Sequence, residues 1–289
     1  MKALAYATAH ALDAFAIVQI DVAEPQLRDT DLLVEIRAVG LNPGEAYIRS
    51  VRSAEAGGRV ILGWEFAGTV IGVGSAVDAA SLPIGGLTAW EAVFRDRDEL
   101  PAGVDRVLVV GGAGGVGSLA IQLLKVRTSA FVIATASRPQ SRDWCQTMGA
   151  DLVVDHRQDV IAQLNNAGIH QVDMVFSTAG TAENLSWIAE LLRPFGHLSA
   201  IDIAPPFDVG PLVSKSASLH TEMVFAKIIR GFNLSSQGKV LAEIADHVES
   251  GRLRPIVTTR LDGLTAQNMK TAHELLESKR TIGKIVVVV

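Results

Sequence analysis

The chain has 289 residues, of which 48% are hydrophobic and 20% are charged, and its net charge is −5. This length suits two domains or one large one, and the composition is that of a globular protein, which excludes a disordered or fibrous chain. A mildly acidic chain lacks the basic surface that nucleic acid requires, and a single cysteine excludes an intramolecular disulfide and a cysteine-rich zinc site.

The first part of the chain is predicted to be β-rich. Short apolar or alternating runs occupy residues 1–7, 14–22 and 31–39, and polar or proline-containing breaks separate them. Residues 63–77 form a further strand with glycines inside it. Several short strands between turns indicate an irregular barrel or sandwich. The N-terminus lacks the apolar core of a signal peptide, so a soluble, cytoplasmic protein is expected.

The pattern changes near Ser81, and from Arg106 onward strands and helices alternate. The near-continuous β-branched run at 107–110 is typical of a parallel strand that is buried on both faces. Alternating strands and helices predict βαβ units and a parallel sheet. The predicted strands are 107–110, 131–134, 152–154, 172–176 and 198–203, and the predicted helices between the first of them cover 116–124 and 141–148.

The last stretch combines both kinds of element. A helix is predicted over 240–250, a strand after Pro255 and a helix over 266–278, and the chain closes on a β-branched strand at 285–289. The lone cysteine, Cys145, falls at the end of a predicted helix and is expected to be a buried small hydrophobic residue.

A glycine motif joins the first strand of the predicted sheet to the first helix. The run Gly112-Ala113-Gly114-Gly115-Val116-Gly117 matches G-x-G-x-x-G in the strand–turn–helix context that dinucleotide binding requires. Gly112 is expected to permit the tight turn, Gly114 the approach of the pyrophosphate, and Gly117 the close packing of helix and strand. The first-turn N–H groups of the helix would bind the phosphates. The same glycines argue against a membrane span over the uncharged stretch 107–124.

The end of the next strand indicates which dinucleotide is bound. NAD-binding folds place an Asp or Glu there, to accept hydrogen bonds from the ribose 2′-OH. Here the sequence reads Ala134-Thr135-Ala136-Ser137-Arg138, without an acidic residue before Asp143. A hydroxyl and a guanidinium suit a 2′-phosphate, so Ser137 and Arg138 predict NADPH as the cofactor. His156, after the third strand, either flanks the adenosine or is an ordinary loop histidine.

The glycine loop resembles the nucleotide loop of the medium-chain dehydrogenase/reductase superfamily. The resemblance is nearest to the zeta-crystallin-like quinone oxidoreductases and the zinc-type alcohol dehydrogenase-like proteins, and it covers nearly the whole chain. It is supported by Gly40-Leu41-Asn42-Pro43, Tyr47-Ile48-Arg49-Ser50, Gly63-Trp64-Glu65-Phe66-Ala67-Gly68, Leu82-Pro83-Ile84-Gly85-Gly86-Leu87-Thr88-Ala89-Trp90 and the ending around His273-Glu274-Leu275-Leu276 and Ile282-Gly283-Lys284-Ile285-Val286.

The resemblance implies an α/β architecture with two domains. A GroES-like, β-rich catalytic domain would comprise residues 1–92 and 252–289. A doubly wound Rossmann domain that binds NADP would comprise residues 93–251. The resemblance also implies a homodimer formed through the Rossmann sheets.

Two departures from the family pattern matter, and the first concerns zinc. Zinc alcohol dehydrogenases hold the catalytic metal with two cysteines and a histidine. The resemblance places Asn42 at the first cysteine position, Trp64 at the histidine position and the remaining ligand near Ile84, and Cys145 lies far away in the sequence. These residues lack the thiolate and imidazole ligands that zinc prefers, so no metal is expected.

The second departure is a missing segment. Family members continue after residues 73–77 with a Gly-Asp turn and further barrel strands before the helix that begins near Ala79 here. Either the chain is truly shortened at this point or a stretch has been left out of the sequence, and the second alternative is favoured. A true deletion would remove part of the substrate wall and expose sheet edges.

These features together favour a reductase. Without zinc, alcohol oxidation lacks its Lewis acid, whereas a quinone or activated alkene accepts hydride because the charge delocalises onto a conjugated oxygen. The resemblance puts Asn42 and Tyr47 near the nicotinamide as candidate catalytic residues, with Tyr47 either donating a hydrogen bond or proton to the substrate or forming an aromatic wall. Thr178 is expected near the nicotinamide ribose. Residues that would line either the cofactor or the subunit interface are Phe195, Ile201, Asp202 and the region 216–225.

Other enzyme classes fit less well. A short-chain reductase needs Tyr-x-x-x-Lys, but Val51 follows Tyr47 and His10 follows Tyr6 at that spacing, and no G-x-S-x-G marks a serine hydrolase. The sequence therefore predicts a zinc-independent, NADPH-dependent oxidoreductase that transfers hydride to a small quinone or activated alkene or carbonyl (enone), with no nucleic-acid or membrane partner. The alternatives are a non-catalytic dinucleotide-binding sensor or structural protein and a zinc-free alcohol dehydrogenase-like reductase.

Overall fold

The computed structural model describes residues 1–23, 34–69, 80–95, 98–204 and 206–289. The chain divides into two compact units, one of residues 1–83 and 255–289 and the other of residues 84–254. Both junctions differ from the expected boundaries near 92 and 252. The difference is largest at the first junction, where helix α3 (Pro83–Val93), apart from its first residue, belongs to the second unit.

Close packing explains why α3 is part of the second unit. A Cβ atom added at Gly85 would lie 3.0 Å from Cδ1 of Leu119, and one added at Gly86 would lie 2.7 Å from Cδ1 of Ile244. The helix thus uses its two glycines to approach two other helices of that unit.

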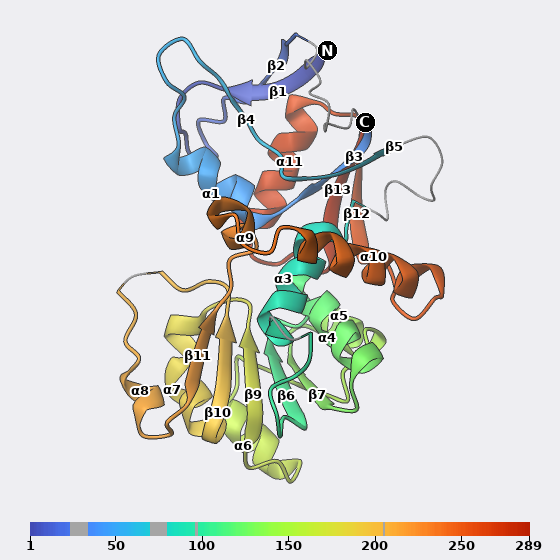
Figure 1. The fold of residues 1–289 in the computed structure, drawn as a ribbon. Helices are drawn as coiled ribbons and strands as arrows, with labels where there is room; N and C mark the ends of the chain where they lie inside the picture. The colour runs from blue at the N-terminus through green and yellow to red at the C-terminus, as the bar shows by residue number, and fades with distance from the viewer. Residues whose placement is uncertain (24–33, 70–79, 96–97, 205) are drawn as a thin grey trace. The chain divides into compact units, whose positions relative to one another are not determined.

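The second unit contains a six-stranded parallel sheet in the order β11-β10-β9-β6-β7-β8 (Figure 1). This is the order of a doubly wound dinucleotide-binding sheet, with the reversal of strand order between β6 and β9. The strands are β6 (Arg106–Val110), β7 (Phe131–Thr135), β8 (Leu152–Val154), β9 (Val172–Ser177), β10 (Leu192–Ala200) and β11 (Ser218–Thr221). The helices, besides α3, are α4 (Gly115–Arg127), α5 (Pro139–Thr147), α6 (Val160–Asn166), α7 (Thr181–Leu191), α8 (Gly210–Val213), α9 (Ala226–Arg230) and α10 (Ser235–Glu249).

Both faces of this sheet are covered, as the β-branched run predicts. Leu108 and Val110 belong to a core cluster with Leu164 of α6 and Ile188 of α7. Because side chains alternate along a strand, Val107 points to the opposite face, where it is also fully buried. The predicted parallel sheet is confirmed.

One predicted strand has different bounds. The strand expected over 198–203 begins at Leu192 and ends at Ala200. The first half of the strand was not predicted because it contains Pro194 and Gly196, which are rare inside strands. The strand accommodates them with an irregular register between Leu192 and His197.

The described part of the first unit is β-rich and contains two sheets. A three-stranded antiparallel sheet has the order β2-β1-β4, and a four-stranded sheet has the order β12-β13-β3-β5 with only the β12–β13 pair parallel. The elements are β1 (Lys2–Tyr6), β2 (Val18–Asp21), β3 (Glu35–Leu41), α1 (Pro43–Val51), β4 (Val60–Ile61), β5 (Glu65–Thr69), β12 (Val257–Asp262), α11 (Ala266–Glu277) and β13 (Lys284–Val288).

The two ends of the chain meet in the core of this unit. Leu4 and Tyr6 of β1 pack in one cluster with Met269 of α11 and with Ile285 and Val287 of β13. The last strand also pairs with β3, so the C-terminal tail completes the β-rich unit.

Two further expectations from the sequence bear on the fold. Cys145 is buried and unpaired, as expected, and burial raises the pKa of its thiol to about 12. No helix in the described part of the chain is both long and apolar enough to cross a membrane. The expected missing segment after Val77 lies outside the described residues.

Candidate functional site

The glycine loop between β6 and α4 corrects one expectation. The left-handed backbone of the turn lies at Gly111, with φ of +78°, whereas Gly112 does not have a positive φ. The tight turn therefore depends on Gly111, which precedes the motif. Gly112 has a packing role instead, because a Cβ there would lie 2.8 Å from Cβ of Ala134 and 3.1 Å from Sγ of Cys145.

Gly117 brings the helix against the turn, as expected. A Cβ at Gly117 would lie 2.3 Å from the carbonyl oxygen of Gly111 and 2.8 Å from Cα of Gly112. Real Cβ atoms do not approach backbone this closely, so every other residue type would push α4 away from β6.

Gly114 differs from these two glycines because protein packing leaves room beside it. It is the N-cap of α4 and provides no side-chain cap for the helix. A Cβ at Gly114 would only touch the oxygen of Gly111 at an ordinary 3.5 Å. Uncapped N–H groups and a bare backbone at a helix N-terminus suit a phosphate group, so this loop fits the pyrophosphate of a dinucleotide.

The threonines on either side of the loop fix its position. Thr135, at the end of β7, accepts a hydrogen bond from Gly111 N–H at its Oγ1 atom, at 3.0 Å. Thr178, after β9, donates from Oγ1 to the carbonyl oxygen of Val110 at 2.8 Å. Thr178 thus lies beside the glycine loop at the carboxyl ends of the strands, where ligands of such sheets bind.

Ser137 and Arg138 follow β7 at the same edge of the sheet, and both are half-buried. Arg138 is the N-cap of α5, and its backbone N–H donates to Ser141 Oγ at 3.1 Å. His156 is exposed in the loop after β8. The structure thus gathers the candidate cofactor-binding residues of the second unit along one sheet edge.

Arg142 is a residue at this edge that the sequence analysis missed. Its guanidinium donates from Nη1 to the carbonyl oxygen of Ala136 at 3.5 Å and from Nη2 to that of Val153 at 3.1 Å, so it lies beside β8 and the end of β7. Its position one helical turn after Arg138 on α5 is the signal that could have found it.

The structure separates the residues offered as alternatives for lining the cofactor. Phe195 lies in the first half of β10, and the amino ends of parallel strands lie opposite the edge with the glycine loop. Phe195 therefore lies away from the sheet edge that holds the glycine loop. Ile201 and Asp202 do follow the carboxyl end of β10, where Asp202 Oδ2 accepts the N–H of Thr181 at 3.1 Å and so caps α7.

Asn42, in the first unit, is the centre of a buried hydrogen-bond network. Its Oδ1 atom accepts from Lys284 Nζ at 2.6 Å, and its Nδ2 atom donates to Glu45 Oε1 and to Glu65 Oε2, each at 3.3 Å. Lys284 Nζ also lies 2.5 Å from Glu65 Oε2. Because a lysine only donates and a carboxylate only accepts, these partners fix which way the Asn42 amide points.

The charged members of this network are withdrawn from solvent. Glu45, Glu65 and Lys284 are 0%, 2% and 5% exposed. Burial raises the pKa of Glu45 to about 7, against the opposing effects of the hydrogen bonds from its own backbone and Asn42 and of the Lys284 charge. Gly40 makes the space, since a Cβ there would lie 2.5 Å from Glu65 Oε2.

The donor set around Asn42 does not fit a catalytic zinc ion. The Asn42 amide oxygen is bonded to an ammonium, and the indole of Trp64 covers Gly44, where a Cβ would lie 2.7 Å from Cζ3 of Trp64. Cys145 belongs to the other unit. Across the described ranges, no three His, Cys, Asp or Glu side chains come together as metal ligands would.

Tyr47 lies on α1, five residues after Asn42, and the residue is 65% exposed. Its hydroxyl is therefore accessible to a ligand, whereas the polar atoms of Asn42 are directed at Lys284, Glu45 and Glu65. The sequence analysis also missed these three partners of Asn42. Lys284 is 242 positions away in the chain, whereas Glu45 follows Asn42 by three residues, the spacing of a capping box, and could have been found from that signal.

Two protein families match the chain, and together the matched residues include parts of both units. The family described as "Alcohol dehydrogenase GroES-like domain" matches residues 28–121, and the family described as "Zinc-binding dehydrogenase" matches residues 148–287. A zinc-type alcohol dehydrogenase-like protein of Staphylococcus aureus (strain MSSA476) is 31% identical over 91% of this chain and 92% of its own length. An NADPH-dependent alkenal/one oxidoreductase of Arabidopsis thaliana is 24% identical over 99% of this chain and 79% of its own length.

Solved structures share the fold over the full length of the chain. A Rhizobium etli CFN 42 protein assigned to the zinc-dependent alcohol dehydrogenases has a TM-score of 0.92 and 32% identity, and the match covers 100% of this chain and 98% of that one. The quinone oxidoreductase of Thermus thermophilus, whose complex with NADPH is also known, has a TM-score of 0.79 and 21% identity, with 100% of both chains covered.

The alignment with the staphylococcal relative also bears on chain length. It spans 313 residues, while 91% of 289 residues is about 263, so the relative has about 50 positions that this sequence does not fill. Both alternatives for the missing segment are compatible with that difference. The matched families and the relative that is similar over nearly its whole length show that the chain belongs to the medium-chain dehydrogenase/reductase superfamily and is an oxidoreductase of that type.

Proposed function

We propose that this protein is a zinc-independent, NADPH-dependent reductase of quinones or of activated alkenes and carbonyls. The observation that carries the proposal is a pair of features of the two units. The second unit has a glycine loop with room for a phosphate, and Ser137 and Arg138 lie at the end of the neighbouring strand. In the first unit, the ammonium of Lys284 donates a hydrogen bond to Asn42, which occupies the position of a zinc ligand.

The residues of the second unit would hold the dinucleotide. The first-turn N–H groups of α4, next to Gly114 and Gly115, would bind the pyrophosphate with the positive end of the helix dipole. Arg138 and Arg142 would bind the 2′-phosphate, because a guanidinium forms paired hydrogen bonds with phosphate oxygens. NADPH, when bound, supplies the hydride.

The residues of the first unit would serve the substrate. Tyr47 has an accessible hydroxyl that can donate to the oxygen on which charge develops when a quinone or enone is reduced. Asn42 would act indirectly, because its amide is already bonded to buried charged partners. The alkenal/one oxidoreductase activity of the Arabidopsis relative supports an enone substrate, and the quinone oxidoreductase that shares the fold supports a quinone.

The cofactor preference is tested by titrating the purified protein with NADPH and with NADH while following the fluorescence of the reduced nicotinamide. Loss of one good phosphate contact corresponds to about 1.5–3 kcal/mol, or roughly ten- to hundredfold in affinity. NADPH is expected to bind tighter by that factor, and a screen of quinones and enones then identifies the acceptor. Equal affinity for NADH would overturn the cofactor assignment.

A second candidate function is dinucleotide binding without turnover, as in a sensor. The observation that favours it is the difference of about 50 positions from the staphylococcal relative, because a substrate wall could be incomplete. NADPH binding without oxidation by any quinone or enone in the screen would support this candidate against the reductase.

A further inference from the structure

Helix α4 carries both chain connections of the second unit. The chain enters this unit at Ile84 and leaves it at Arg254. On the entering side, Gly85 of α3 packs against Leu119 of α4. On the leaving side, Gln122 of α4 forms two hydrogen bonds with the backbone of Arg254, accepting its N–H at 2.7 Å and donating to its carbonyl oxygen at 3.2 Å.

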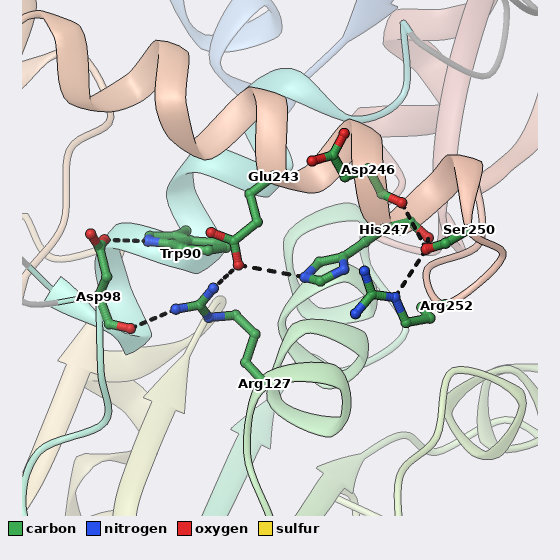
Figure 2. A network of polar contacts seen from close by, with 8 residues as sticks. All are labelled: Trp90, Asp98, Arg127, Glu243, Asp246, His247, Ser250 and Arg252. Carbon is green, nitrogen blue, oxygen red and sulfur yellow. Dashed lines mark hydrogen bonds and ion pairs between the residues drawn. The ribbon is translucent and has the colours of Figure 1, made fainter.

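Arg127, at the C-terminal end of α4, reaches both neighbouring helices (Figure 2). Its guanidinium carbon lies 3.9 Å from the ring centroid of Trp90, which is on α3. It donates to the carbonyl oxygen of Asp98 at 2.7 Å, and Trp90 Nε1 donates to Asp98 Oδ1 at 2.8 Å. It also pairs with the Glu243 carboxylate on α10. One cation therefore ties α4 to α3 and to α10.

His247 faces the same carboxylate from the next turn of α10 (Figure 2). Its Nε2 atom lies 3.6 Å from Glu243 Oε1, the oxygen that accepts from Arg127. His247 is 6% exposed, and within the described part of the chain neither of its ring nitrogens has a hydrogen-bond partner. Burial lowers the pKa of His247, the Arg252 and Arg127 charges lower it further, and the Asp246 carboxylate opposes them.

We propose that Arg127, Glu243 and His247 form a latch. At neutral pH the Arg127–Glu243 ion pair holds both chain connections on α4, and on acidification this ion pair breaks and the latch opens. A protonated His247 competes with Arg127 for the Oε1 atom of Glu243. It also adds a buried positive charge close to those of Arg127 and Arg252. The charged groups that face it are Arg127 from α4, Glu243 and Asp246 from α10, and Arg252 from the turn that follows. Opening would loosen the contacts of α4 with α3 and with α10, inside the second unit.

The sign of the pH dependence follows from proton linkage. A histidine that is held neutral in the closed latch binds a proton more readily once the latch opens. The stabilisation is therefore complete above the ordinary histidine pKa of 6.5 and is lost as the pH falls through the lower pKa of the closed state.

Hydrogen exchange of the protein without added cofactor, measured by mass spectrometry, tests the proposal. Rates are corrected for the intrinsic effect of pH. In the wild type, peptides from 243–256 are expected to exchange about tenfold faster at pH 5.5 than at pH 7.5, and His247→Gln is expected to remove that difference. His170→Gln is the control, because His170 is exposed and bonds Asn165. A His247→Gln variant with the wild-type pH dependence would overturn the latch.

A second pair of variants tests the connection between the two links at constant pH 7.5. Glu243→Gln removes the shared carboxylate with little change of volume, and it is expected to speed exchange in both 84–93 and 243–256. Glu249→Gln, at the exposed end of the same helix, is the control. Faster exchange in only one of the two segments, or in neither, would show that Arg127 does not join them. Because dinucleotide is absent throughout, failure here is distinct from failure of the proposed reductase.

Discussion

The Nζ atom of Lys284 lies 2.5 Å from Oε2 of Glu65, and the two side chains are 5% and 0% exposed. The pair joins the first residue of β13 to the first residue of β5, on opposite sides of β3 in the four-stranded sheet. A buried ion pair is costly to break from one side, because the remaining charge keeps its desolvation penalty without its partner.

Replacement of this lysine should therefore destabilise the protein strongly. Lys284→Met leaves Glu65 buried without the ammonium, and a loss of about 3–5 kcal/mol in the free energy of unfolding is expected from denaturant titration. Lys2→Met is the matched control, because its pair with Asp21 is exposed and contributes below about 1 kcal/mol. Adding Glu65→Gln should recover part of the loss. Equal effects of the two lysine variants would contradict a stabilising role for the network.

The glycine loop predicts opposite behaviour at two of its positions. Gly117→Ala forces a Cβ against the oxygen of Gly111, so a loss of about 1–3 kcal/mol in unfolding free energy is expected. Gly114→Ala meets only an ordinary contact, so stability should change little, while dinucleotide affinity should fall about tenfold because the methyl group occupies the ligand's approach. Calorimetric titration and thermal unfolding of both variants check this. Unchanged affinity in Gly114→Ala would remove the loop from the cofactor site.

The proposed 2′-phosphate contact predicts a change in cofactor preference. Arg138→Gln should weaken NADPH binding by roughly ten- to hundredfold and leave NADH binding almost unchanged, because only NADPH carries the extra phosphate. Arg106→Gln removes an exposed cation from the amino end of the same sheet and serves as the control. If Arg138→Gln weakens both dinucleotides equally, the arginine supports the fold of α5 and does not select the phosphate.

Several features of the fold and site could be predicted from the sequence because they depend on local patterns. The β-branched runs that form β6 and β13 and the glycines of the loop are examples. The position of the left-handed turn could not be predicted, since Gly111 and Gly112 are adjacent and either can adopt it. Contacts over long sequence separations, such as Asn42 with Lys284, depend on how β13 returns to the first part of the chain.

His273 predicts that stability decreases in acid. It is fully buried, its Nδ1 atom accepts from Arg49 Nε at 3.1 Å, and burial together with the Arg49 and His10 charges lowers its pKa to about 4. The unfolded chain takes up the proton near 6.5, so this stabilisation is complete above 6.5 and is lost as the pH falls toward 4.

The test of His273 compares unfolding free energies between pH 7 and pH 4.5. On acidification the wild type should lose up to about 1.4 kcal/mol per pH unit relative to His273→Gln, which keeps an acceptor for Arg49. His170→Gln should retain the wild-type slope. A parallel decrease in all three proteins would assign the acid sensitivity to other groups.

Glu45 predicts that stability depends on pH with the opposite sign to that predicted from His273. Its pKa in the folded protein, about 7, exceeds the ordinary 4.5, because the buried carboxyl group is desolvated. The folded chain therefore binds the proton more tightly than the unfolded chain. The stabilisation is complete below 4.5 and is lost as the pH rises through 7.

The pH-dependent contributions of Glu45 and His273 to stability overlap and partly cancel, so the Glu45 contribution is measured in the His273→Gln background. There, Glu45→Gln, which still accepts from the Asn42 N–H but does not ionise, should flatten the decrease between pH 4.5 and 7, whereas the exposed control Glu55→Gln should leave it unchanged. A persistent decrease in Glu45→Gln would mean that this carboxyl group ionises as easily in the folded protein as in water, and that the hydrogen bonds from Asn42 and the Lys284 charge offset its burial.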